Sequence, residues 1–240
     1  MAGIAAILLL WEGGSLIFGS PLIFPGPLPV LQRLFKLLHD EWFLLSLVQS
    51  FLRVLGGVAL SVPLGIAVGI AGGLDKRARS FFQPLFTVVS ATPVMAVILI
   101  AFLILGTGRT PLFTAFLMVF PVMAANTMAG IKSVDPKLVE LFTVYNLSRC
   151  ERLSSLYLPA IAPFIIGGLR SSLSLCWKVV VAAEVLVQPI LALGTGMQRA
   201  RVQLETAELF AWTAGTVLAA ALSQLLLSLA LKLFNRRKKQ

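Results

Sequence analysis

The sequence predicts an all-α membrane protein, and three observations support this fold class. Apolar residue types make up 58% of the 240 residues and charged types only 12%, about half the charged share of a soluble domain. Mean hydropathy is +0.93. Uncharged apolar runs long enough to cross a bilayer, which takes about 20 residues, recur along the chain. This composition excludes an ordinary soluble enzyme, a disordered chain and a fibrous repeat.

We expect six transmembrane helices in a single domain over residues 1–240. The first apolar run starts at Met1 without a basic segment before it, which favours a retained helix over a cleaved signal peptide. Residues 106–108 read as a turn between the third and fourth helices, because two glycines flank Thr107. The expected helices cover 2–19, 44–73, 80–106, 110–131, 161–187 and 209–233.

The connections between these runs differ in character. Residues 20–29 contain four prolines and are expected to be irregular, since proline cannot continue a helix. Residues 28–38 alternate apolar positions with Arg33 and Lys36, which favours a short amphipathic helix at the membrane interface. Residues 132–159 and 187–208 are the two long connections.

Positive charge predicts the orientation, because Lys and Arg gather on cytoplasmic loops. One set of connections carries five such residues: Arg33, Lys36, Arg109, Arg199 and Arg201. The opposite set carries twelve: Lys76, Arg77, Arg79, Lys132, Lys137, Arg149, Arg152, Lys232, Arg236, Arg237, Lys238 and Lys239. We therefore expect residues 132–159 and both termini in the cytoplasm, and we read the net charge of +10 as flanking charge rather than as a nucleic-acid surface.

The sequence lacks the patterns that carry common chemistry. There is no Gly-x-x-x-x-Gly-Lys-Ser/Thr loop to cradle nucleotide phosphates and no His-Glu-x-x-His zinc motif. His39 is the only histidine, and Cys150 and Cys176 show no metal or disulfide spacing. We expect no catalytic residue, no metal site and no cofactor in this chain, which would act by moving rather than by chemistry.

Residues 135–159 form the most informative stretch. Asp135 followed by Pro136 is a helix start, with an N-cap acceptor before proline in the first turn. Asn146 tolerates the left-handed conformation that ends a helix. A second short helix is expected over 148–158. The first helix carries an apolar face with no obvious partner in the chain, formed by Leu138, Leu141, Phe142 and Tyr145.

This arrangement resembles the EAA loop of ABC importer permeases, which reads Glu-Ala-Ala, three residues, Gly, nine residues and Ile-x-Leu-Pro. All internal spacings agree. The sequence departs from the pattern at the two alanines and at the glycine. The matching positions are Glu140, Asn146 at the Gly, Leu156 at the Ile, Leu158 and Pro159, and the alanines are replaced by Leu141 and Phe142.

The resemblance covers nearly the whole chain and is to the nitrate/sulfonate/taurine branch of these permeases. It rests on residues 24–31, 50–65, 176–184, 193–197 and 205–212. It implies a type I importer-like fold in the bacterial cytoplasmic (inner) membrane. The implied partners are a second copy of this chain, two ATP-binding cassette subunits that bind ATP and Mg, and an extracytoplasmic substrate-binding protein. Lipid surrounds the chain, and no nucleic acid is implied.

The resemblance further implies that the helix from Asp135 to Asn146 is a coupling helix, seated in a groove of the ATPase. Closure of the ATPases would then switch the membrane helices from inward- to outward-facing. The residues assigned to coupling are Asp135, Leu138, Glu140, Leu141, Phe142, Tyr145, Asn146, Leu156, Leu158 and Pro159.

Four ionisable residues fall within or at the edge of the expected spans, where charge is costly and faces the protein interior. Lys178 and Glu184 are about 240° apart around one helix, so each needs a partner elsewhere. One hypothesis places Lys178, Glu184 and Arg53 along the translocation path, favouring an anionic solute. The alternative for Arg53 is a fixed ion pair with Glu12, or a side chain that reaches to the interface.

Two other classes of function stay open on the sequence. A secondary transporter or channel that acts without an ATPase would need coupling-ion sites in broken helices or repeats, and no convincing internal repeat is visible. A membrane scaffold without transport is the second alternative. The sequence does not name the solute; sulfonates, nitrate, taurine and bicarbonate are candidates.

Overall fold

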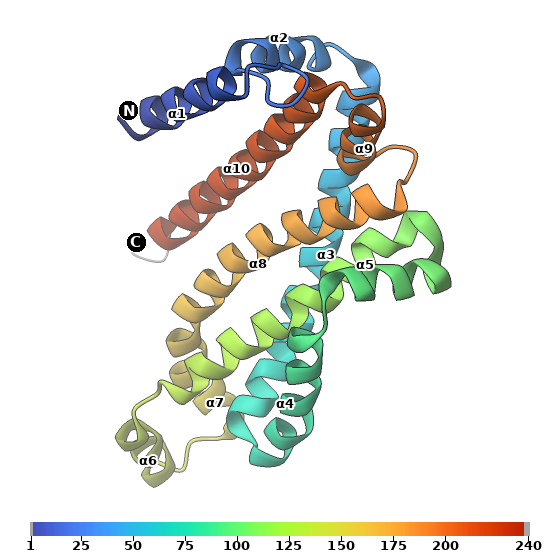
Figure 1. Cartoon of the computed structure of the whole chain (residues 1–240). Coiled ribbons are helices and arrows are strands. Elements are labelled where there is room, and N and C mark those ends of the chain that lie inside the picture. Colours follow the sequence, from blue (N-terminus) through green and yellow to red (C-terminus); the bar gives the residue numbers. More distant parts are fainter. Residues whose placement is uncertain (1, 238–240) are drawn as a thin grey trace. The chain divides into compact units, whose positions relative to one another are not determined.

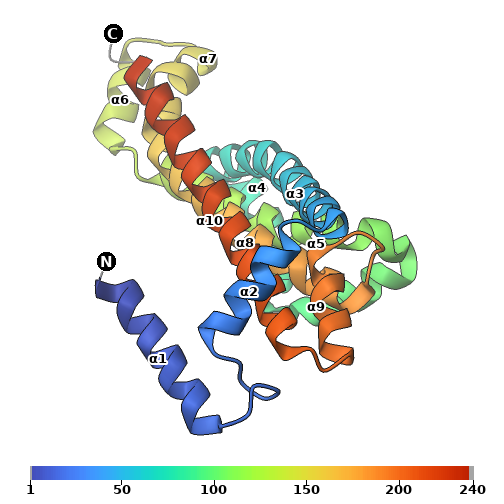
Figure 2. The same ribbon diagram turned by 90° about the horizontal axis from the view of Figure 1, so that it is seen from above.

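The computed structural model describes residues 2–237, and no strand occurs among them (Figures 1 and 2). Lys238 and Lys239, counted above as cytoplasmic charges, lie outside the described residues, as does Met1. The elements are α1 (Ala2–Phe18), α2 (Pro27–Leu37), α3 (Glu41–Leu74), α4 (Lys76–Ala91), α5 (Val94–Lys132), α6 (Pro136–Val144), α7 (Arg149–Arg152), a π-helical stretch (Leu153–Tyr157), α8 (Leu158–Val187), α9 (Leu193–Val202) and α10 (Thr206–Arg237).

Two compact units make up the chain. Unit 1 comprises Met1–Arg53 and Val180–Ser223, and unit 2 comprises Val54–Val179 and Gln224–Gln240. Helices α3, α8 and α10 each contribute residues to both units.

Within residues 2–237, four helices are long and apolar enough to cross a membrane, which confirms the all-α membrane fold class. They are Glu41–Leu74, Val94–Lys132, Cys150–Val187 and Thr206–Leu233, and a shorter apolar helix covers Ala5–Phe18. The second of these is interrupted at Gly106, whose φ of 72° and ψ of −177° separate two helical stretches, 94–105 and 107–132. The turn expected at Gly106 is therefore present, since only glycine adopts this backbone conformation readily.

The helix expected over 80–106 is wrong as a single helix. The chain leaves the helical conformation at Thr92, with φ −75° and ψ 128°, and a new helix begins at Val94. The cause is Pro93, because a proline ring disfavours the helical conformation of the residue before it. The expected run is thus divided between α4 and the first stretch of α5.

Two further boundaries need correction. The irregular segment expected over 20–29 ends earlier, because α2 already begins at Pro27, and proline is tolerated in the first turn of a helix. The connection over 187–208 contains α9 (Leu193–Val202). This helix was not predicted because two of its first four residues are glycines, and glycine disfavours helix interiors.

In unit 2, α3 and the second stretch of α5 pack at very close range. A Cβ atom added at Gly65 would lie 2.5 Å from Met123 Cβ, and one at Gly69 would lie 2.5 Å from Thr127 Cβ. Met123 and Thr127 are fully buried. Glycines four residues apart therefore form the α3 side of this contact, as in other membrane helix pairs joined by small residues.

In unit 1, α2 has the amphipathic pattern expected of it. Val30, Leu34 and Leu37 are buried. The fully buried Phe43 of α3 packs against Trp212 of α10, with ring centroids 4.8 Å apart. On the polar side, Arg33 of α2 forms an ion pair of 2.9 Å with Glu205.

Candidate functional site

Helix α6 is defined at both ends by local hydrogen bonds. The Asp135 carboxylate accepts a 2.9 Å hydrogen bond from the Lys137 backbone N–H, so it is the N-cap. Asn146 has a φ of 52°, and the N–H groups of Asn146 and Leu147 donate to the carbonyls of Thr143 and Phe142. This is a Schellman motif, which satisfies the last carbonyls of a helix. The predicted helix start and the left-handed Asn146 are both confirmed.

Helix α7 follows α6 after four residues, and hydrogen bonds connect the two helices. Ser148 and Glu151 form a capping box: Glu151 Oε2 accepts from the Ser148 N–H at 2.8 Å, and Ser148 Oγ accepts from the Glu151 N–H at 3.3 Å. The Arg152 guanidinium donates to the Leu147 carbonyl at 2.9 Å and to Thr143 Oγ1 at 3.2 Å. These bonds span the turn, so α6 and α7 form a stiff pair, the α6–α7 pair.

The α6–α7 pair carries uncovered apolar side chains. No residue of α6 is buried. Val144 is 78% exposed, Tyr145 71% and Leu141 48%, and Leu138 is also exposed. Figures 1 and 2 show α6 beside α7, at the end of the chain path that leads from α5 to α8. An exposed apolar face of this kind is a candidate docking surface.

The other residues assigned to coupling include both exposed and buried side chains. Glu140 and Asn146 are exposed on α6 and its end, and Phe142 is partly buried. Leu156 is buried in the π-helical stretch that follows α7. Leu158 and Pro159 are exposed in the first turn of α8.

A second cluster lies in unit 1 around a fully buried carboxylate. Arg53 Nη1 donates to Glu184 Oε1 at 2.8 Å, and the exposed fraction of the Glu184 side chain is 0%. Ser50 Oγ lies 2.8 Å from both carboxylate oxygens, and the Gly194 N–H donates to Oε2 at 3.2 Å. Every oxygen of the buried carboxylate is therefore hydrogen-bonded, which is what a buried charge requires.

The same cluster holds the start of α9. Arg53 Nη1 also donates to the Leu191 carbonyl at 2.9 Å, and the Leu193 N–H donates to Ser50 Oγ at 3.0 Å. A Cβ atom at Gly194 would lie 2.5 Å from the backbone nitrogen of Val185, so only glycine allows this approach. We call Ser50, Arg53, Glu184 and Gly194 the buried ion-pair cluster.

The remaining intramembrane charges lie elsewhere. The partner of Arg53 is Glu184, so the alternative pair with Glu12 is not formed; Glu12 is exposed on α1. Lys178 is exposed on α8. Among the described residues, no carboxylate lies within ion-pair distance of Lys178. The same residues contain no group of three His, Cys, Asp or Glu side chains that could hold a metal ion.

Sequence reasoning missed the link from Arg53 to Glu184, although a signal for it existed. Ser50 and Arg53 are three residues apart, so they share one face of α3. A polar pair on an otherwise apolar helix needs a polar partner, and Glu184 is the buried acid among the four charges considered.

Comparison with known proteins decides the family. Residues 61–240 match the family described as "Binding-protein-dependent transport system inner membrane component". The chain belongs to this family. It is therefore a multi-pass membrane permease of ABC importers, a non-enzymatic subunit, and its resemblance to the nitrate/sulfonate/taurine type is confirmed.

Individual relatives agree with this assignment. The permease is 34% identical to a Brucella melitensis protein named "Probable ABC transporter permease protein", over 78% of this chain and 76% of that one. It is 30% identical to the taurine transport system permease protein TauC of Escherichia coli, over 98% of this chain and 86% of that one. A crystal structure of an amino acid ABC transporter with histidines shares the fold, with a TM-score of 0.66 and 17% identity, covering 85% of this chain and 97% of that one.

Proposed function

We propose that this permease takes up a small anionic solute by alternating access, driven by ATP hydrolysis in a separate subunit that docks on α6. The observation that carries the proposal is the α6–α7 pair: a short, doubly capped helix whose apolar side chains are exposed. A helix held rigidly at both ends can transmit a push to α5 and α8, to which it is joined. A flexible loop would absorb the same push.

The proposed assembly follows the family. Two copies of this chain form the membrane part, two ATP-binding cassette subunits bind ATP and Mg, and an extracytoplasmic binding protein delivers the solute. This chain itself needs no cofactor. Six spans result if the break at Gly106 is a turn within the membrane region: α1, α3, α4 with 94–105, 107–132, α8 and α10. The positive charges then place α6 and both termini in the cytoplasm.

The proposed solute class is sulfonate-, nitrate- or taurine-like. The relative TauC is named for taurine, which carries a sulfonate group. Lys178 supports an anionic solute, because it is exposed and has no carboxylate partner among the described side chains. Arg53 and Glu184 neutralise each other, and we assign them to holding α3, α8 and α9 together rather than to contact with solute.

The test is ATP hydrolysis by the purified complex of permease and ATPase. Leu141→Asp places a charge on the exposed apolar face of α6, and we expect hydrolysis stimulated by the loaded binding protein to fall at least tenfold. Ser155→Asp is the matched control, because it adds the same charge at an exposed position outside α6, and it should leave stimulation unchanged. Full stimulation in Leu141→Asp would contradict docking through α6. Uptake driven by an ion gradient with this chain alone would instead establish a secondary transporter.

A further inference from the structure

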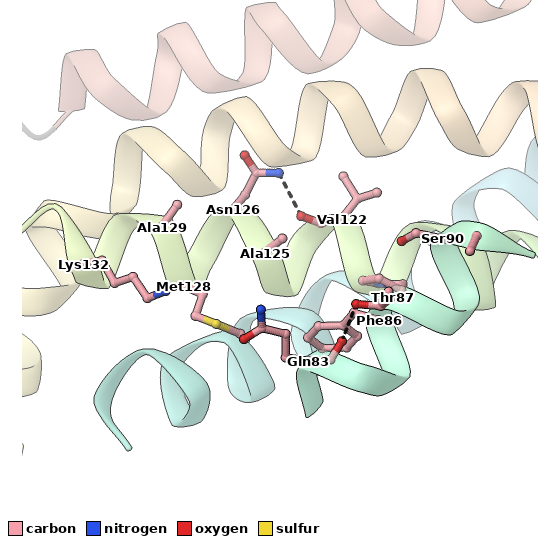
Figure 3. A pocket seen from close by; sticks show the side chains of 12 residues that line it. Gln83, Phe86, Thr87, Ser90, Val122, Ala125, Asn126, Met128, Ala129 and Lys132 are labelled. Carbon is pink, nitrogen blue, oxygen red and sulfur yellow. Dashed lines mark hydrogen bonds between the residues drawn. The ribbon is translucent and has the colours of Figure 1, made fainter. Parts of the chain in front are cut away.

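Unit 2 contains an open cavity of about 840 Å³ between α4 and the second stretch of α5 (Figure 3). Its volume lies in the range of small-molecule sites, about 300–1,000 Å³. The wall on α4 consists of Gln83, Phe86, Thr87, Ser90 and Ala91. The wall on α5 consists of Pro121, Val122, Ala125, Asn126, Met128, Ala129 and Lys132.

The polar groups of this cavity follow the helix periodicity. Gln83, Thr87 and Ser90 are spaced at i, i+4 and i+7, so they share one face of α4. Asn126 and Lys132 add an amide and an ammonium group from α5, and Figure 3 shows Lys132 at one end of the α5 row. The lining contains one cation and no carboxylate. Such a set of donors suits a solute that carries negative charge.

The amide and ammonium groups of this cavity keep donors for an anion, whereas Thr87 does not. Thr87 Oγ1 donates its hydrogen to the Gln83 backbone carbonyl at 3.0 Å, which leaves only acceptor lone pairs. Asn126 Nδ2 donates one N–H to the Val122 carbonyl at 2.8 Å, which leaves its second N–H and its carbonyl oxygen. Ala125 and Ala129 are exposed on the same wall, so small side chains keep the space between the polar groups open.

A second cavity in unit 2 provides the contrast. It has a volume of about 420 Å³ and only apolar lining residues: Val97, Ile100, Ala101, Ile104, Leu105, Phe113 and Leu117. The polar row from Gln83 to Ser90 therefore distinguishes the first cavity from the second.

We infer that the cavity between α4 and α5 is a solute site on the translocation path, and that it binds a small solute with a sulfonate-like anionic group. Lys132 attracts the charge, and Gln83 and Asn126 donate hydrogen bonds to its oxygens. The inference rests on the proposed function and adds to it a cavity and the named residues that would hold the solute. Only Ser133 and Val134 separate Lys132, the last residue of α5, from the α6 cap, Asp135.

The test uses a thiol placed in the cavity of the full-length permease in nanodiscs. In a Cys150→Ser background, which retains only the buried Cys176, the exposed lining residue Ala125 is replaced in Ala125→Cys and labelled with two methanethiosulfonate reagents. One reagent carries a sulfonate and the other a trimethylammonium group. Each rate is divided by the rate of the same reagent with a free thiol, because the thiolate itself favours the cationic reagent. Lys132 carries the only charge among the lining residues, so we expect the corrected rate to favour the sulfonate reagent. Lys132→Gln should abolish this preference, whereas Lys132→Arg should keep it.

Two controls separate a site from general surface charge. Lys76→Gln removes a positive charge from the start of α4, outside the cavity, and should leave the reagent preference unchanged. Methanesulfonate should slow labelling of Ala125→Cys more than chloride at equal ionic strength, and Lys132→Gln should remove this protection.

The outcomes are distinguishable from those of the proposed function. Equal effects of Lys132→Gln and Lys76→Gln, or no protection by methanesulfonate, would overturn the cavity proposal while ATP-driven transport could stand. Because labelling needs neither ATP nor partner subunits, a failed hydrolysis test would overturn the proposed function and leave the charge preference of the cavity measurable.

Discussion

The buried ion-pair cluster and the cavity between α4 and α5 each contain a cation that lies on a long apolar helix. The cation of the cluster is paired with a carboxylate and, among the described residues, the cation of the cavity is not. Arg53 meets a buried carboxylate and a backbone carbonyl, and its side chain is only 14% exposed. Lys132 lies on the wall of an open cavity without a carboxylate. We infer from this contrast that an unpaired cation on an apolar helix, and not a paired one, is a candidate for contact with solute.

Removal of the two cations should change the folding free energy by different amounts. Removing one member of a buried pair leaves an uncompensated charge, which costs folding free energy. Removing an exposed cation from a cavity costs little folding free energy but changes what the cavity attracts. Stability and transport should therefore respond separately in the two regions.

The largest effect is expected from Glu184→Leu. The substitution leaves the Arg53 guanidinium without its carboxylate, and we expect a loss of about 3–5 kcal/mol in unfolding free energy. Denaturation of the permease in nanodiscs, followed by tryptophan fluorescence, measures the change. The double variant Arg53→Met with Glu184→Leu should recover much of the loss. A single variant as stable as the wild type would show that the pair does not hold the helices.

The next effect concerns the close approach of α9 to the same cluster. Gly194→Ala would place a Cβ atom 2.6 Å from Glu184 Cβ, and overpacking of this kind costs about 1–3 kcal/mol. Gly167→Ala is the matched control on α8, because nothing lies within 4 Å of its added Cβ atom. Equal stability of the two alanine variants, measured by the same unfolding experiment, would refute the close contact.

A smaller effect is expected at the turn between α6 and α7, which lies in neither region and serves as a reference. Asn146 has a φ of 52°, and Asn146→Ala should cost about 1 kcal/mol because alanine disfavours the left-handed conformation. Asn146→Gly should preserve the turn. Hydrogen exchange of the Leu147 amide reports this local stability, and faster exchange in the glycine variant than in the alanine variant would contradict the assignment.

The smallest effect on stability is expected at Lys132. Lys132→Gln should change unfolding free energy by less than about 0.5 kcal/mol, as is usual for exposed positions, while uptake of an anionic solute falls several-fold. Thermal unfolding and uptake into proteoliposomes, measured on the same preparation, check the two parts. A variant that unfolds readily would place Lys132 with the structural cations and remove the contrast between the two regions.

Local signals in the sequence were sufficient for α6. Asp135, Pro136 and Asn146 act on the backbone within a few residues of themselves, so their effects could be predicted without knowledge of the fold. The amphipathic helix α2 was visible for the same reason. Pro93 carried an equally local signal for a helix break. The prediction of one helix over 80–106 was wrong because it gave more weight to the length of the apolar run than to this proline.

Contacts between distant segments could not be predicted in the same way. Arg53 and Glu184 are 131 positions apart. We predicted both along the translocation path because each is a charged residue among apolar neighbours. Lys132 was counted as a loop charge because it ends an apolar run. Its role depends on α4 lying beside α5, which is a property of packing and not of either helix alone.

The most direct test of the account is site-directed crosslinking from α6 in membranes that contain the permease and its ATPase. Leu141→Cys in the Cys150→Ser background should capture the ATPase subunit with a short bifunctional reagent. Leu204→Cys, at a position more exposed than Leu141 but expected on the opposite side of the membrane, should capture none. We therefore expect capture from α6 and not from position 204. Failure of Leu141→Cys, Val144→Cys and Tyr145→Cys to capture an assembled ATPase would contradict it.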